Sequence, residues 1–142
     1  MSIFIKRIFR IIIVLLVVIS GCASIDLSTP EKNLASLYQA IASKDPKLYA
    51  DCYYTGRGVG IGDLNRAAQD VFKHVTVVEH RIISRQELSP IFVNLTVEEI
   101  SYREDGKKYA STFTVKYVKI GDEWKVLSVE NIETRKMDKT EK

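Results

Sequence analysis

Apolar residues recur at helical spacing in the segment that follows residue 29. They occupy positions i, i+3, i+4 and i+7, which lie on one face of an α-helix: Leu34, Leu37, Tyr38 and Ile41. Thr29 can cap the first turn with its side chain, and Pro30 suits the first helical position. The pattern predicts a first helix that begins at residue 30 and buries one apolar stripe.

Two further helices are expected before the pattern changes. Asp45-Pro46 again combines a capping side chain with a proline, which predicts a second short helix that ends at about Tyr54. Asp63 can cap a third helix, whose apolar face would hold Leu64, Ala67, Ala68, Val71 and Phe72. The glycine-rich residues 56–63 lack the glycine spacing of a dinucleotide-binding turn, so we expect a flexible loop that could form the lip of a pocket.

From residue 75 onward the apolar period becomes two, which is typical of β-strands. Residues 75–88, 91–103 and 108–120 predict three long strands, and a fourth follows the Gly121-Asp122 turn. Asp105-Gly106 indicates a two-residue hairpin turn. Helices followed by an antiparallel meander predict an α+β fold, with a sheet that must curl or be covered to bury one face.

The start of the chain has the layout of a signal peptide. Three basic residues precede the uninterrupted apolar run 11–19, which is much shorter than the ~20 residues that span a bilayer. Ile19-Ser20-Gly21-Cys22 resembles the lipobox of bacterial lipoproteins, in which the cysteine accepts a diacylglycerol and becomes the first residue after cleavage. We therefore expect removal of residues 1–21 and membrane attachment through lipid on Cys22. The alternative is an ordinary secreted protein with a chance cysteine at this position.

Residue 23 bears on the destination of the protein. The usual signal for retention at the inner membrane is an aspartate directly after the lipidated cysteine, and this chain has Ala23 there. The resemblance therefore implies the outer membrane, facing the periplasm, if the organism has one. In other organisms it implies the outer face of the cell membrane.

Charge and cysteine content support this division of the chain. The net charge of +3 comes from the three basic residues of the signal peptide, because the remainder carries 18 basic and 18 acidic residues. A neutral domain lacks the electrostatic footprint of nucleic-acid binding, so no nucleic acid is expected as a partner. If Cys22 carries lipid, Cys52 has no internal partner, and we expect it to be a buried apolar residue.

Two stretches resemble the nuclear transport factor two-like family, whose domain is the cystatin-like cone. Ser43-Lys44-Asp45-Pro46 stands at the break between the first two helices of such proteins, and residues 121–126, Gly-Asp-Glu-Trp-Lys-Val, resemble the opening of their last strand. The resemblance implies N-terminal helices packed on a strongly curved antiparallel sheet of about four long strands. It covers residues 29–133, which leaves residues 22–28 as a lipidated tether and 134–142 as a disordered charged tail.

Alternation along the strands selects candidate site residues. Glu99 continues the apolar face of the second strand, and His80 shares a face of the first strand with Val78 and Ile82. If these faces point inward, the residues that could line a cavity are Tyr38, His80, Glu99, Phe113, Tyr117 and Trp124. Glu99 and His80 are then the candidate catalytic residues, because a carboxylate in apolar surroundings can act as a base. Alternatively, Glu99 lies beyond the core and His80 is a surface or satisfied histidine, and a one-residue bulge would reverse either assignment.

Neither a metal nor a cofactor is expected from the sequence. The two histidines, His74 and His80, lie six residues apart, and zinc needs three or four ligands. Two classes of function stay open. The first is a non-catalytic envelope lipoprotein that binds a small ligand or a protein partner, with a homodimer through the sheet as a further expectation. The second is a cone-fold enzyme, an isomerase, cyclase or hydrolase, that acts on a small hydrophobic substrate; the lack of a recognisable catalytic set favours the first.

Overall fold

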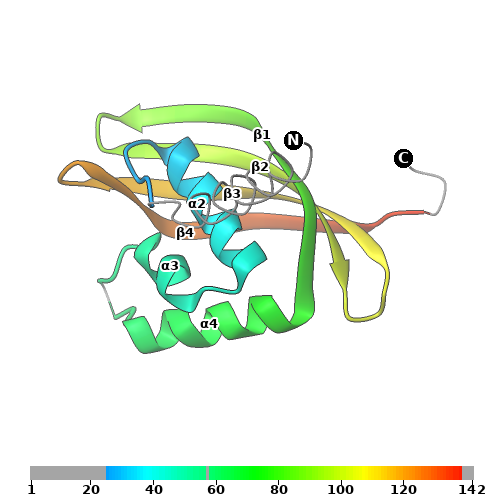
Figure 1. Cartoon of the computed structure of the whole chain (residues 1–142). Coiled ribbons are helices and arrows are strands. Elements are labelled where there is room, and N and C mark those ends of the chain that lie inside the picture. Colours follow the sequence, from blue (N-terminus) through cyan, green and yellow to red (C-terminus); the bar gives the residue numbers. More distant parts are fainter. Residues whose placement is uncertain (1–24, 57, 139–142) are drawn as a thin grey trace, which may run out of the picture.

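The computed structural model describes residues 25–56 and 58–138. Three helices precede four strands (Figure 1): α2 (Pro30–Ser43), α3 (Pro46–Asp51), α4 (Ile61–His74), β1 (Val75–Ser89), β2 (Phe92–Arg103), β3 (Lys108–Ile120) and β4 (Glu123–Lys136). The predicted signal peptide, Cys22 and residues 139–142 lie outside the described residues. In the described ranges, no helix is long and apolar enough to cross a membrane.

Local capping explains where the first two helices begin. The Thr29 side chain accepts a hydrogen bond from the backbone N–H of Lys32, and Pro30 opens α2. The Asp45 carboxylate accepts from the N–H groups of Lys47 and Leu48 at the start of α3. Both predicted caps are confirmed.

The other helix boundaries differ from the prediction. Gly60, not Asp63, caps α4, because Asp63 lies one turn inside and its carboxylate accepts from the Gly60 N–H at 3.2 Å. The second helix ends at Asp51 and not near Tyr54. Backbone bonds to β4 stop it, because Cys52 and Tyr54 both pair with Val126, at 2.8 Å each.

The four strands form one antiparallel sheet in the order β1-β2-β3-β4. Strands β2 and β3 pair without a break, whereas three register shifts interrupt β1–β2 and two interrupt β3–β4. Bulges bend and twist a strand, so both edges of the sheet curve while its centre stays regular. The α+β fold with helices on a four-stranded antiparallel sheet is confirmed.

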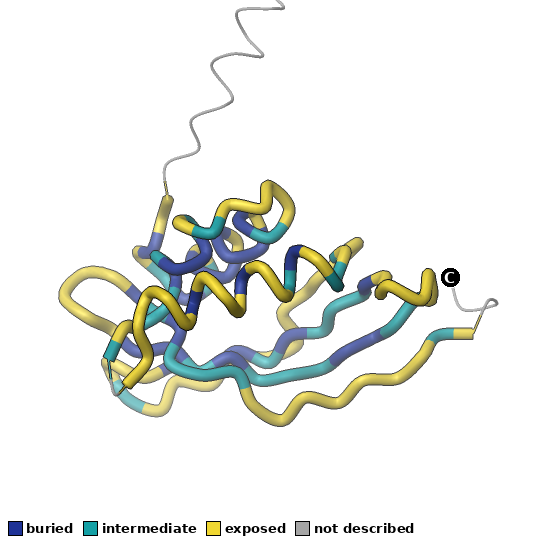
Figure 2. Tube along the Cα trace, turned by 90° about the horizontal axis from the view of Figure 1, so that it is seen from below, coloured by how far each residue is buried: buried dark blue, intermediate teal, exposed yellow. Residues whose placement is uncertain are grey.

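The helices cover one face of this sheet, and the core lies between them (Figures 1 and 2). Val93, Leu95 and Val97 of β2 are fully buried under α2, which contributes Leu34, Leu37 and Tyr38. Helix α4 lies beside α3, where Phe72 meets Tyr49 edge-on with ring centroids 6.0 Å apart. The apolar stripes read from the sequence are therefore the surfaces that pack together.

Three strand details correct the sequence-based prediction. A register shift falls between Val77 and Glu79, so Val77 packs against the core while Val78 is exposed; the predicted inward face of β1 is wrong at Val78. The β2–β3 turn holds residues 104–106 rather than two residues, because Arg103 pairs with Lys107. β4 continues to Lys136, opposite Tyr109. The prediction that the tail begins at residue 134 is therefore wrong for residues 134–136, which belong to β4.

Candidate functional site

A hollow of about 240 Å³ lies between α2 and the covered face of the sheet. Most of its lining is apolar and comes from α2, α3, α4 and all four strands, including Leu37, Ile41, Tyr53, Val77, Phe113 and Val129. Glu99 and Arg103 are the charged residues of the lining, and Ser111 is a polar one. The hollow can therefore receive a small apolar group and offers it few polar contacts.

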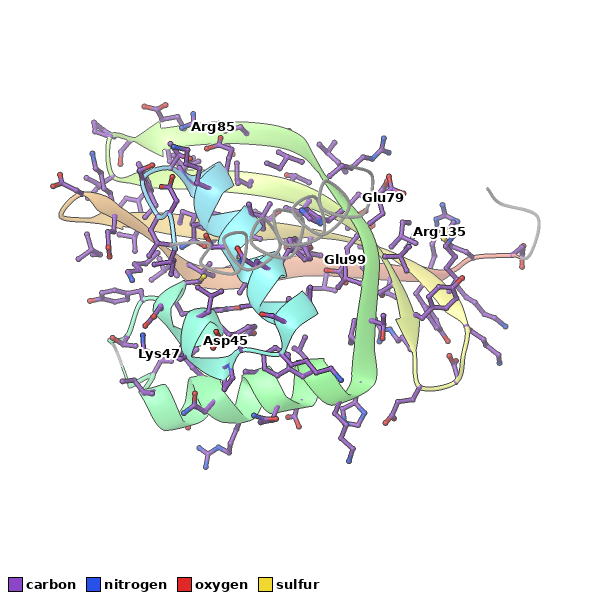
Figure 3. All side chains as sticks on the ribbon, in the orientation of Figure 1. Asp45, Lys47, Glu79, Arg85, Glu99 and Arg135 are labelled. Atoms are coloured by element: carbon purple, nitrogen blue, oxygen red, sulfur yellow. The ribbon has the colours of Figure 1, made fainter. Side chains whose placement is uncertain are left out.

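Glu99 is held from the helix side by a tyrosine. The Tyr38 hydroxyl donates a hydrogen bond to Glu99 Oε2 at 2.7 Å, and the Glu99 side chain lies near the middle of the sheet, between α2 and β1 (Figure 3). Burial, followed by the nearby Glu99 charge, raises the pKa of Tyr38 well above its usual range. Tyr38 is therefore a neutral donor that orients the Glu99 carboxylate at the wall of the hollow.

His80 lies on the other side of the same tyrosine. Its ring stacks on the Tyr38 ring with centroids 3.7 Å apart and an interplanar angle of 13°, and its backbone pairs with Glu99 across the sheet. His80 is exposed and lines a second hollow of about 280 Å³, between α2 and the start of β1. Partial burial lowers the pKa of His80, and the Glu99 charge opposes that shift.

The predicted pocket residues fall into two groups. Tyr38, Glu99 and Phe113 line the inner hollow, with His80 next to them. Tyr117 and Trp124 are buried in the core and line neither of these two hollows.

Sequence reasoning missed two polar residues of the lining. Ser111 lies opposite Glu99 on β3, is buried, and shares a hydrogen bond of 2.9 Å with the Thr134 hydroxyl of β4. Arg103 lines the hollow while its guanidinium lies 5.1 Å from the Tyr109 ring centroid. Alternating positions were the signal that could have found them: Arg103 lies four residues after Glu99 on β2, and Ser111 lies two residues before Phe113 on β3.

A third missed residue, Asn33, belongs to the framework that holds the helices on the sheet. Its side-chain amide is fully buried and donates to the Cys52 carbonyl at 2.9 Å and the Trp124 carbonyl at 2.7 Å. These bonds join α2 to the end of α3 and to β4. Cys52 is buried as expected, and burial raises the pKa of its thiol to about 12, so it stays protonated and unreactive at neutral pH.

A third hollow, larger than the two described above, lies outside the space between α2 and the sheet. It measures about 590 Å³ and is lined by α3, the start of α4 and the β3–β4 turn. Its charged groups already have partners: Lys47 pairs with Asp51 at 3.0 Å, and Lys125 pairs with Glu123 at 3.3 Å. The described residues contain no group of three or more potential metal ligands. The inner hollow, with Glu99 at its wall, is therefore the candidate site.

No protein-family model and no curated protein matches the sequence. Solved structures do match the fold. A SEC-C motif containing protein from Rhodopseudomonas palustris is 19% identical over 76% of this chain and 82% of its own, with a TM-score of 0.63. A ketosteroid isomerase-like protein from Erwinia carotovora atroseptica is 17% identical over 79% of this chain and 96% of its own, with a TM-score of 0.57.

A third solved structure matches the fold as well. A protein from Thiobacillus denitrificans, described as an association domain of calcium/calmodulin-dependent protein kinase type II, is 13% identical over 72% of this chain and 93% of its own, with a TM-score of 0.59. Identities this low show the fold and not the activity. The chain thus has the cone fold of the ketosteroid isomerase-like and nuclear transport factor two-like proteins.

Proposed function

We propose that this protein is a lipid-anchored envelope protein whose cone binds a small, mainly apolar ligand without transforming it. The observation that carries the ligand proposal is the inner hollow with the Glu99 carboxylate at its wall. Its volume of about 240 Å³ lies just below the ~300–1,000 Å³ of sites for drug-sized molecules. The ligand is therefore small.

The polar residues that line the hollow indicate which head group the ligand carries. Glu99 already accepts one hydrogen bond, from Tyr38, and a carboxylate has room for several more. A ligand with an amine or a hydroxyl can donate to it, whereas an anionic head group placed at Glu99 would be repelled by that carboxylate. Arg103, the cation of the lining, lies with its guanidinium 5.1 Å from the Tyr109 ring centroid. Glu99 is the one carboxylate of the lining, so a paired-acid mechanism is absent there, which favours binding over catalysis.

A matched set of small molecules tests this proposal. Cyclohexylamine, cyclohexanol and cyclohexanecarboxylate share one apolar body and differ in the head group. They are added to the full-length lipidated protein in phosphatidylcholine nanodiscs, and binding is followed by amide chemical shifts and by thermal unfolding. The amine and the alcohol should shift the amide signals of residues around Glu99, and the carboxylate should not.

Glu98 provides the matched control for this experiment. It neighbours Glu99 but points to the opposite face of the sheet, where it pairs with Arg81 at 2.8 Å. Glu99→Gln should weaken amine binding about tenfold or more, since hydrogen bonds to charged groups contribute roughly 1.5–3 kcal/mol, and Glu98→Gln should leave it unchanged. Equal effects of both changes, or tight binding of the carboxylate, would contradict the proposal.

The lipid anchor is tested separately. The protein is expressed with a clickable fatty acid, and the cells are fractionated. The wild-type chain should carry the label and sediment with the envelope, and the Cys22→Ser chain should lose both properties. With Ala23 after the cysteine, we expect the outer membrane where the organism has one. A labelled, membrane-bound Cys22→Ser chain would refute the anchor.

One observation favours an enzyme as the second candidate. A carboxylate that is oriented by a tyrosine inside an apolar hollow has the composition of a general base for proton abstraction. Exchange of the α-protons of cyclohexanone in D₂O tests this directly by NMR. Exchange above the buffer rate that disappears in Glu99→Gln and persists in Glu98→Gln would replace the binding proposal with an enolising enzyme.

A protein partner and a homodimer through the sheet remain predictions. The outward face of the sheet carries ion pairs, such as Lys116 with Glu130 at 2.7 Å, which a dimer would have to cover. Sedimentation velocity over a range of concentrations decides whether the chain self-associates.

A further inference from the structure

Exposed apolar side chains gather at one end of the domain. Twelve large apolar residues are exposed within the described ranges, and seven of them lie at the end where the chain enters the domain, so their distribution is uneven. One of the seven is Ile25. The other six define a rim, with exposed fractions from 37% to 63%: Val59, Ile61, Leu88, Ile91, Phe92 and Ile120.

The six residues come from three loops that meet in space. The β1–β2 and β3–β4 turns lie at the same end of the sheet, where the N–H of Lys119 donates to the carbonyl of Ile91 at 2.9 Å. Ile61, at the start of α4, lines the same outer hollow as Ile120. Figure 1 shows the β1–β2 turn, the β3–β4 turn and the α3–α4 loop together at the left of the domain.

The chain enters the domain at this same end. The N–H of Trp124, directly after the β3–β4 turn, donates to the carbonyl of Leu27 at 2.8 Å. Cys22 precedes Leu27 by five residues, and five extended residues span at most about 18 Å. A lipid on Cys22 therefore holds the rim within a short distance of the bilayer.

The charges near the rim indicate what kind of surface it meets. Of the described residues, Lys119 and Lys125 lie near this end together with Glu87, Asp122 and Glu123. Lys47, which lines the outer hollow, pairs with Asp51, so these residues form no basic patch. At the opposite end, the β2–β3 turn and the end of β4 carry Lys107, Lys108 and Lys136 around a shared hollow. The end nearest the predicted anchor is the apolar one.

We propose that the rim docks onto the lipid bilayer, with the tips of three loops inserted at the level of the headgroups. This inference rests on the proposed lipid anchor, which supplies the proximity. Binding to an interface scales with the apolar area that it buries, so the surface that we propose for the rim is a zwitterionic bilayer. The opposite end then faces away from the membrane.

Site-directed spin labels test the docked orientation. Single cysteines replace Ile120 or Ile61 in the rim and Tyr102 or Lys107 at the opposite end, while Cys52 stays unlabelled because it is fully buried. The lipidated full-length chain is placed in phosphatidylcholine vesicles, and accessibility to oxygen and to a nickel chelate is measured. Rim labels should gain oxygen access and lose nickel access, and labels at the opposite end should remain in water.

Charged variants supply the control. Ile91→Lys with Ile120→Lys should return a label at residue 61 to water, whereas Ile132→Lys, at a more exposed site near the far end of β4, should not. Rim labels that are as water-accessible as those at the opposite end would refute docking while leaving the anchor intact. Rim labels shielded from both reagents would indicate protein packing and would equally refute it.

Failure of the anchor is distinguishable from failure of docking. If mass spectrometry finds no acyl group on Cys22, the anchor proposal fails, and a maleimide lipid is then coupled to Cys22 chemically. The same accessibility measurement on that conjugate decides whether the rim inserts once it is brought to a bilayer.

Discussion

Helix α2 carries two polar side chains that face the sheet, and the structure uses them in opposite ways. Asn33 is fully buried, and both of its amide hydrogens are bonded to backbone carbonyls of other elements. Tyr38, five residues later, donates to Glu99, whose carboxylate is half-buried at the wall of a hollow. The first site is closed off from solvent and joins three elements, with the Asn33 amide oxygen buried without a hydrogen-bond partner in the described structure. The second site keeps acceptor capacity available at a hollow. Buried polar groups that bond other elements stabilise the fold, and a carboxylate at the wall of a hollow is available to a ligand.

The largest expected effect comes from the closed site. Trp124 is buried in the core, and its backbone carbonyl accepts a hydrogen bond from the Asn33 amide. Trp124→Ala keeps that carbonyl but removes the packing volume of the indole ring. We expect a loss of about 3–5 kcal/mol from a total of about 5–15 kcal/mol. Urea unfolding followed by circular dichroism measures it, with Trp124→Phe as the milder control. A Trp124→Ala chain that unfolds at the wild-type midpoint would remove Trp124 from the core.

Removal of the Asn33 amide should cost somewhat less. Asn33→Ala leaves a buried carbonyl of Trp124 without this donor, and we expect a loss of roughly 2–4 kcal/mol for the two bonds. Ser101→Ala is the matched control, because the Ser101 hydroxyl is just as buried but has no hydrogen-bond partner in the described structure. Its removal should cost less than about 1 kcal/mol. Equal losses would mean that burial, and not bonding, determines the effect.

Changes at the open site should alter stability least and binding most. Tyr38→Phe keeps the ring on His80 and removes one hydrogen bond, so we expect a loss of about 1 kcal/mol. A double-mutant cycle with Glu99→Gln should yield a coupling of similar size, because the two side chains share that bond. A coupling near zero, with ligand binding unchanged in both variants, would place the Tyr38–Glu99 pair in the framework instead.

The smallest effect is the titration of His80. Its pKa should lie below the ordinary value of 6.5, because partial burial disfavours the charged ring. The folded state then binds fewer protons than the unfolded state, so the contribution to stability is present above pH 6.5 and is lost as the pH falls through the lowered pKa. Glu99→Gln should lower the His80 pKa further, since the Glu99 charge raises it. NMR of the imidazole protons reports the pKa, and a rise in Glu99→Gln would contradict this electrostatic picture.

Most predictions based on contacts within a few residues were confirmed, whereas the cap at Asp63 and the end of the second helix near Tyr54 were wrong. The caps at Thr29 and Asp45 and the burial of Cys52 follow from neighbouring residues and from apolar periodicity. Predictions that needed one exact register were less successful. The register shift between Val77 and Glu79 leaves Val78 exposed, and the pairing of Arg103 with Lys107 lengthens the β2–β3 turn.

The sequence by itself determined the order of the helices and strands, their apolar faces and the α+β class. It did so because side-chain spacing and capping act locally, within one or two turns of the chain. The tertiary structure alone decided which polar residues meet: Asn33 reaches a carbonyl 91 positions away and Tyr38 reaches a carboxylate 61 positions away. It also brought three loops and the entering chain to one apolar end. Such pairings depend on how the curved sheet and the helices pack around a common core, and the spacing of neighbouring side chains does not determine that packing.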